Sequence, residues 1–159
     1  MPASELDPID RKILNLLQSD GRMSINDLAA QVGLSPSPCL RRVRLLEKAG
    51  VINRYVAVLD QRAVGLPVSV FISIKLDKQR EEMLERFGKT ISRWPEVLEC
   101  YLMTGQRDYL LRVVVPDLPS YERFLKTKLT RLDGIASIES SFALEQVKYT
   151  NVLPVDAGA

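Results

Sequence analysis

The sequence predicts an α+β protein in which three short helices are followed by a β-α-β-β-α-β segment. Two observations carry this prediction. Apolar residues recur at helical spacing as far as Gly50, and a capping residue precedes each helix. Beyond Pro67, runs rich in β-branched residues alternate with helical patterns, which is typical of a sheet covered by helices. We therefore expect two domains, over residues 1–52 and 68–159, joined by a strand linker over 53–67.

The composition limits the classes of function. Among its 159 residues the chain has no histidine and two cysteines, Cys39 and Cys100. The lack of histidine excludes Ser-His-Asp and Cys-His catalysis and histidine metal ligands. Two cysteines so far apart in sequence do not predict a disulfide framework or a zinc site. No apolar run approaches the ~20 residues that cross a bilayer, and the N-terminus lacks a signal-peptide pattern. We expect a cytoplasmic protein with no membrane partner and no metal.

The first two helices are predicted from their caps. Asp7 is placed to cap the first helix, Pro8 suits its first position, and Asp10 is favoured near its positive end. Ser24 begins a second helix in a pattern similar to a capping box. Gly33 then supplies the turn, because glycine lets the chain reverse.

The third helix has two possible starts. Ser35-Pro36 and Ser37-Pro38 each offer a cap followed by proline. We favour Ser37, since Pro38 is poorly tolerated deep inside a helix. Gly50 closes the helix as a C-cap.

Positive charge is concentrated on this third helix. Two short helices joined by a tight turn, the second one basic, form the layout of a winged-helix-like helix-turn-helix, which places its second helix in the major groove of double-stranded DNA. Some of these side chains have the alternative role of solvating the exposed helix face or pairing with Glu47. The candidate DNA contacts are Ser35, Ser37, Arg41, Arg42, Arg44 and Lys48.

The rest of the chain predicts a strand over 51–59, a linker ending at Pro67, and a ferredoxin-like domain. Its strands are expected over 68–76, 97–104, 109–115 and 135–147, and its helices over 78–94 and 118–132. Residues 105–108 form a hairpin turn between the second and third strands.

The motifs across both halves resemble those of the Lrp/AsnC family of feast/famine regulators, most closely its leucine-responsive branch. The resemblance runs from about Leu6 to Asn151. In the N-terminal half its residues are Leu6, Asp7, Ile9, Asp10, Ile13 and Leu14, then Val32-Gly33-Leu34-Ser35-Pro36, then Arg42, Val43, Leu46, Glu47, Gly50, Val51 and Ile52. In the C-terminal half they are Gly105, Asp108, Tyr109, Leu110, Leu111, Glu145, Val147 and Lys148.

This resemblance implies a transcriptional regulator, not an enzyme, that needs no cofactor and answers to a small amino acid such as leucine. It also implies dimers through the C-terminal sheets and the linker strand, which assemble further into octamers. The effector-binding residues that it implies are Gly105, Gln106, Arg107, Asp108 and Tyr109. Two alternatives stay open: an architectural DNA-organising protein without an effector, and a tetrapyrrole decarboxylase, which the lack of histidine disfavours.

The turn has a chemical rationale for this ligand. Asp108 is able to accept hydrogen bonds from an ammonium group, and the backbone N–H groups of Gly105 and Gln106 suit a carboxylate. Without the resemblance, an ordinary hairpin turn is the favoured interpretation of the same residues. Whether Arg107 faces the ligand or solvent is left open.

Overall fold

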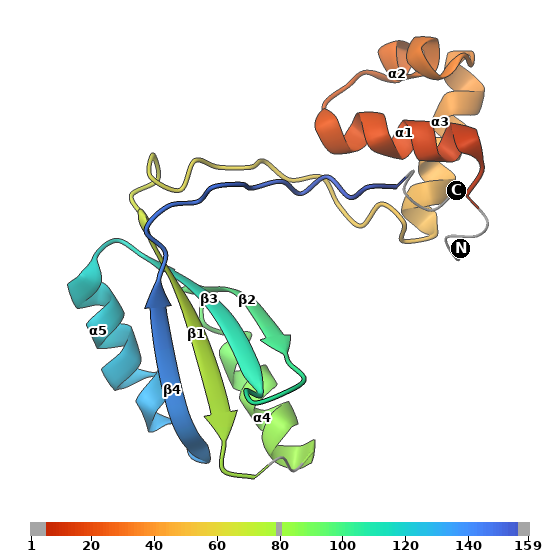
Figure 1. Cartoon of the computed structure of the whole chain (residues 1–159). Helices are drawn as coiled ribbons and strands as arrows, with labels where there is room; N and C mark the ends of the chain where they lie inside the picture. Colours follow the sequence, from red (N-terminus) through yellow and green to blue (C-terminus); the bar gives the residue numbers. More distant parts are fainter. Residues whose placement is uncertain (1–5, 79–80, 156–159) are drawn as a thin grey trace. The chain divides into compact units, whose positions relative to one another are not determined.

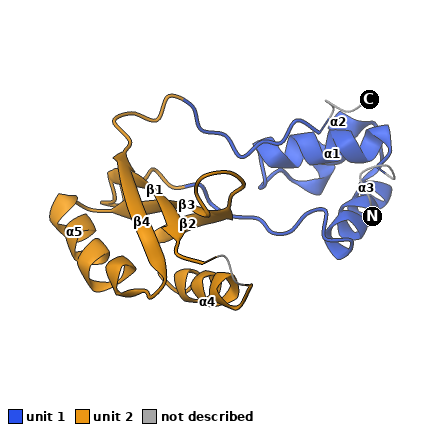
Figure 2. Cartoon of the chain, turned by 60° about the horizontal axis from the view of Figure 1, so that its bottom comes forward, with its two compact units in different colours: residues 1–58, 148–159 blue, residues 59–147 orange. Residues whose placement is uncertain are grey.

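A computed structural model of the chain describes residues 6–78 and 81–155. The chain divides into two units, residues 1–58 with 148–159 and residues 59–147 (Figure 2). This division differs from the predicted domain boundaries at two places. The first unit continues past residue 52, and the C-terminal segment groups with the first unit although we expected it in the second.

The first unit contains helices α1 (Pro8–Ser19), α2 (Ile25–Val32) and α3 (Pro36–Lys48). The predicted cap at Asp7 is confirmed, because its side chain accepts a hydrogen bond from the backbone N–H of Asp10. Ser24 caps α2 in the same way, and Gly33 ends it in the left-handed conformation with φ of 76°. These local signals place each helix where the apolar pattern predicts it.

Helix α3 begins two residues earlier than predicted. Its N-cap is Ser35, so Pro36 is its first residue and Pro38 lies in its first turn. We had favoured Ser37 as the cap, and that prediction is wrong. The first-turn N–H groups of a helix have no intrahelical partner, so a second proline there removes no helical hydrogen bond.

The core of the first unit is formed by the inward faces of the three helices. Its fully buried side chains come from each helix, and the partly buried Val51, Ile52 and Val155 pack against them. The buried residues are Ile13, Leu14, Leu28, Ala29, Val32, Cys39, Val43 and Leu46.

The predicted strand over residues 51–59 is absent from this described part of the chain. Its residues are instead irregular, and Val56, Val58 and Leu59 are more than half exposed. A strand is defined by ladder hydrogen bonds to a neighbour. The β-branched sequence therefore predicts an extended segment, whereas the strand itself requires a partner.

The C-terminal segment binds to helix α1. The side-chain amide of Gln18 donates to the carbonyl of Leu153 and accepts from its N–H, at 3.2 and 2.6 Å. Arg11 Nη1 donates to the carbonyl of Val155 at 2.7 Å. Leu153 and Val155 are thus held to α1; residues 156–159 lie outside the described part.

The second unit is a four-stranded antiparallel sheet in the order β2-β3-β1-β4 (Figure 1). Strands β1 (Val68–Leu76) and β3 (Tyr109–Val115) have the predicted bounds. Between the strands lie α4 (Glu81–Ile91) and α5 (Leu118–Thr127), followed by the short 3-10 helix η2 (Leu129–Arg131). Both long helices bury their apolar sides against one face of β1 and β3. This is the predicted β-α-β-β-α-β arrangement.

Several elements of this unit are shorter than predicted. Strand β2 (Val97–Leu102) stops two residues early, and β4 (Ile135–Phe142) ends before residue 147. The predicted helix over 118–132 is broken at Lys128 into α5 and η2. The start of the predicted helix at 78–94 includes residues 79–80, which lie outside the described residues. Among the described residues, no helix has the length and apolar character needed to cross a membrane.

Candidate functional site

Four of the predicted DNA contacts form one stripe along helix α3. Ser37, Arg41, Arg44 and Lys48 are spaced at i, i+4, i+7 and i+11, and all four are exposed. This spacing places side chains on the same helix face. The opposite face carries Cys39, Val43 and Leu46, which are buried in the core. Core packing therefore turns three positive charges and one hydroxyl toward solvent together.

Ser35 lies at the exposed N-cap of α3, and its side chain makes no capping hydrogen bond. A helix N-terminus attracts anions through its unpaired N–H groups. Pro36 and Pro38 have no N–H, so two of these donors are missing from α3. A phosphate at this end would depend on the side chains of Ser35 and Ser37 more than on the backbone.

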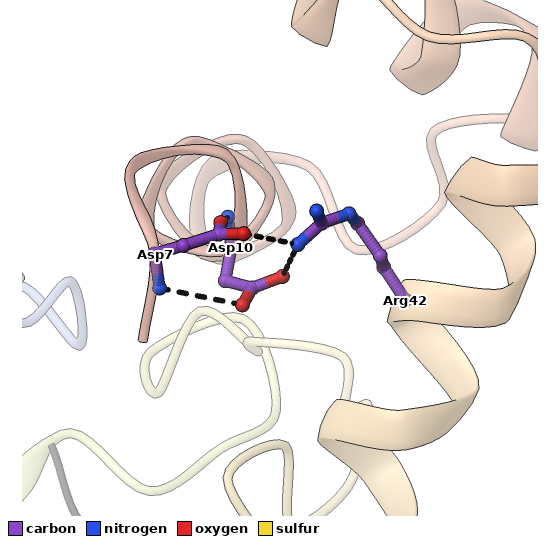
Figure 3. Close-up of polar contacts among 3 residues, drawn as sticks. All are labelled: Asp7, Asp10 and Arg42. Atoms are coloured by element: carbon purple, nitrogen blue, oxygen red, sulfur yellow. Dashed lines mark hydrogen bonds and ion pairs between the residues drawn. The ribbon is translucent and has the colours of Figure 1, made fainter. Parts of the chain in front are cut away.

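Arg42, the sixth predicted DNA contact, lies off the stripe and is bound to helix α1. Its Nη1 donates to Asp7 Oδ2 at 2.6 Å and to Asp10 Oδ1 at 2.7 Å (Figure 3). The two carboxylates raise the pKa of the Arg42 guanidinium. The backbone N–H of Asp10, with Arg42 beside it, lowers the pKa of the Asp7 carboxyl. The structure thus separates Arg42 from the other basic side chains of α3.

A shallow groove of about 520 Å³ runs beside this cluster on the first unit. It combines positive side chains with the exposed Leu45, and its one acidic side chain, Asp10, is paired with Arg42. The groove is lined by Asp10, Arg41, Arg42, Leu45, Leu46, Lys48 and Ala49. Its net positive lining suits an anionic surface.

Gly105 and Gln106 are exposed residues of the hairpin turn between β2 and β3. Gly105 has a φ of 104°, a conformation that residues with a side chain rarely adopt. Lys75 Nζ donates to the carbonyl of Gln106 at 3.0 Å, which ties the turn to the end of β1. The turn is therefore anchored to β1 through the carbonyl of Gln106.

Asp108 and Tyr109 lie inside the unit. Asp108 is 3% exposed, and its Oδ2 accepts from the N–H of Leu76 at 2.7 Å. Tyr109 stacks on Phe87 with ring centroids 4.4 Å apart, and its hydroxyl donates to the carbonyl of Leu84 at 3.1 Å. Burial is the main cause that raises the pKa of Tyr109. Both side chains are thus buried within the unit, and their part in binding an effector stays a prediction.

Arg107 reaches across the sheet to β4. Its Nη1 donates to Ser137 Oγ at 2.8 Å, and its Nη2 pairs with Glu139. Arg107 thus binds β4 on the sheet face that α4 and α5 leave uncovered, and its part toward a ligand stays a prediction. Its guanidinium holds the turn in place.

The sequence did not predict two long-range contacts that bear on the candidate site. We treated Asp7 and Asp10 as helix-end residues without expecting their contact with Arg42, which is more than thirty positions away. We also did not expect the binding of the C-terminal segment to α1. Neither has a local sequence signal, because each joins residues brought together by folding alone.

Family models match both units. A model described as winged helix-turn-helix DNA-binding matches residues 6–53, and one described as the Lrp/AsnC ligand binding domain matches residues 69–153. Together they place the basic helix α3 in a DNA-binding domain and the turn at 105–109 in a ligand-binding domain.

Individual relatives cover nearly the whole chain. The Bkd operon transcriptional regulator of Pseudomonas aeruginosa is 48% identical, over 96% of this chain and 99% of that protein. The leucine-responsive regulatory protein of Escherichia coli K12 is 41% identical, over 97% and 94%. The crystal structure of a Neisseria meningitidis transcriptional regulator in complex with L-Met superposes with a TM-score of 0.90 at 38% identity, over 95% and 97%. The chain belongs to the Lrp/AsnC family and is a DNA-binding transcriptional regulator with a ligand-binding domain.

Proposed function

We propose that the chain reads DNA with the outward stripe of α3 and changes its binding when a free amino acid occupies the ligand-binding domain. The observation that carries the first half is the common exposed face of Ser37, Arg41, Arg44 and Lys48. Arginine makes bidentate contacts with guanine, and both basic side chains pair with phosphate. Ser35 lies at the same helix end and supplies a further hydroxyl.

The proposed effector is an amino acid that meets the exposed turn. The peptide groups of Gly105 and Gln106 suit its carboxylate. Arg107, Asp108 and Tyr109 serve the ligand indirectly, since their side chains bind β4, β1 and α4 and so fix the turn. The complex of the Neisseria regulator with L-Met supports an amino acid as the ligand class.

The proposed assembly is a dimer that associates further, to an octamer. The uncovered sheet face carries Phe71 and Tyr101, which are 38% and 53% exposed. The linker adds exposed apolar residues at Val56, Val58 and Leu59. Large apolar side chains gathered at the surface are typical of interaction sites. A regulator acting on the chromosome in this way works in the cytoplasm, and its relatives are named regulators rather than enzymes.

Salt-dependent binding to the DNA upstream of its own gene tests the first half. We expect the slope of log K against log salt to fall by about one for each phosphate contact removed. Arg44→Gln and Lys48→Gln are the variants. The matched control is Arg86→Gln with Arg93→Gln, which lie in the other unit, on α4 and just after it. If the α3 variants bind with the same affinity and salt slope as the control, α3 does not contact the DNA.

Thermal unfolding in the presence of amino acids tests the second half. A ligand that binds the folded state alone raises the melting temperature, by a free energy of about 2.7 kcal/mol at a hundred times its dissociation constant. We expect a shift with L-leucine or L-methionine and none with leucinamide, which lacks the carboxylate that the turn is proposed to bind. No shift with any of the twenty amino acids would favour the architectural DNA-organising alternative.

A further inference from the structure

We infer that Arg42 is a positioning residue, which fixes the angle of the recognition helix α3 on α1 and does not itself contact DNA. The inference rests on the proposed DNA-binding role of α3. It reassigns one of the six residues that the sequence nominates for DNA and gives a role to Asp7 and Asp10, which the family comparison leaves without one.

Each of the two carboxylates accepts one hydrogen bond from the backbone at the start of α1 and one from Arg42. Asp7 uses Oδ1 to accept from the N–H of Asp10 at 2.8 Å and Oδ2 to accept from Arg42. Asp10 uses Oδ2 to accept from the N–H of Asp7 at 3.4 Å and Oδ1 to accept from Arg42. The capping box of α1 thus orients both carboxylates, and the two remaining oxygens converge on one nitrogen of α3 (Figure 3).

These hydrogen bonds fix the orientation of α3 on α1, which the apolar core between the helices does not fix. Contacts among side chains such as Ile13, Val43 and Leu46 are favourable over a range of helix rotations, because the hydrophobic effect is non-directional. Charge-assisted hydrogen bonds hold a distance and an angle. Asp10 is one-tenth exposed and Arg42 less than one-third, so solvent screens the pair less than an open surface pair.

The position of Arg42 on the helix agrees with this role. One residue of an α-helix turns by about 100°, so Arg42 points well away from the line of Arg41, Arg44 and Lys48. A rotation of α3 about its axis would move that whole line relative to the DNA. By its hydrogen bonds to α1, Arg42 therefore sets the direction in which the three exposed charges point.

The sign of one charge removal separates positioning from direct contact. Asp10→Asn deletes a negative charge from the DNA-binding unit, and simple Coulomb attraction to phosphate predicts tighter binding. Loss of the oriented bond to Arg42 predicts weaker binding. Glu47→Gln deletes a negative charge from exposed α3 itself and is the matched control, expected to bind as tightly as the parent or more tightly.

The experiment measures DNA affinity over a range of salt for the full chain and for Arg42→Gln, Asp10→Asn, the double variant, Glu47→Gln and Arg41→Gln. We expect Arg42→Gln and Asp10→Asn each to weaken binding by roughly tenfold, the effect of one charge-assisted hydrogen bond, with an unchanged salt slope. The double variant should be no weaker than either single one. Arg41→Gln, a direct contact, should lower the slope by about one per bound protomer.

Contrary results are distinguishable from a failure of the proposed function. Normal binding by the parent chain, with a lower slope in Arg42→Gln and tighter binding by Asp10→Asn, overturns the positioning role alone. Absence of DNA binding by the parent chain overturns both proposals. Circular dichroism and urea unfolding of each variant ensure that only folded protein is compared. Arg42→Lys keeps the charge but loses the guanidinium geometry, so it should bind as weakly as Arg42→Gln, with the same unchanged salt slope.

Discussion

Asp108 joins the hairpin turn to Leu76 at the end of β1. Its backbone N–H donates to the carbonyl of Ile74 at 2.8 Å, and its Oδ2 accepts from the N–H of Leu76 at 2.7 Å. The register between β1 and β3 ends at Ile74 and Tyr109, so the side chain extends the pairing by one step. On the other side of β1, the register with β4 shifts between Lys75 and Leu76. The acid that the sequence nominates for a ligand therefore supports the turn that is proposed to hold it.

Asp108→Ala should destabilise the second unit. The change leaves the N–H of Leu76 buried without its partner, which costs about 1–3 kcal/mol. Urea unfolding measures the loss, with Asp133→Ala, an exposed acid in the same unit, as the control. Equal stability of the two variants would show that water or a neighbour replaces the carboxylate.

Gly105→Ala should destabilise the turn although space is available for the methyl group. A Cβ at Gly105 meets no atom within 4 Å, so the expected cost of about 1 kcal/mol is that of a positive φ. Gly88→Ala, in open space within α4, is the matched control and should stabilise by about 0.5–1 kcal/mol. Thermal unfolding checks both signs, and a smaller amino-acid shift in Gly105→Ala would connect the backbone of the turn with the ligand. A stabilised Gly105→Ala would contradict the turn geometry.

Gln18→Ala should release the C-terminal segment from α1. The variant removes both hydrogen bonds that the side chain makes with the backbone of Leu153. We expect the amide of Leu153 to lose protection in hydrogen exchange, since local opening sets the exchange rate. Gln31→Ala, an exposed glutamine on α2, should leave that amide protected. Unchanged exchange in Gln18→Ala would mean that other contacts hold the segment.

The free energy of unfolding of the first unit should decrease in acid as the carboxylate of Asp7 is protonated. Its pKa lies below the ordinary value of 3.8 in the folded chain, chiefly because the N–H of Asp10 bonds to its ionised form. A depressed pKa contributes stability above the unfolded pKa, and that contribution is lost as the pH falls through the folded pKa. The difference in unfolding free energy between the parent and Asp7→Asn should therefore be larger at pH 5 than at pH 3.

Urea unfolding followed by the amide signals of α1 to α3 measures that difference at the two pH values. The same difference at pH 5 and pH 3 would show that the ionised carboxylate of Asp7 adds nothing to the unit. Asp117→Asn changes an acid of the second unit, whose pKa is lowered by Ser120, and should leave the signals of the first unit unaffected.

Elements with local causes were predictable from the sequence. The cap at Asp7, the left-handed Gly33 and the bounds of β1 and β3 follow from residues within a few positions of each. The family and the basic character of α3 were equally accessible, since both reside in linear motifs. The start of α3 was not, because Ser35 and Ser37 offer equivalent local signals.

The sequence by itself determined the order of helices and strands, the family, and the side chains that are candidates for contacting DNA and ligand. Capping, periodicity and charge act between residues that are close in the chain, so they can be recognised without the structure. The tertiary structure decided which residues these side chains pair with. It turned Arg42 toward Asp7 and Asp10, buried Asp108 against Leu76, and tied Arg107 to Glu139. Each decision joins residues about thirty positions apart, and the packing of separate apolar faces, which no local pattern encodes, sets such distances.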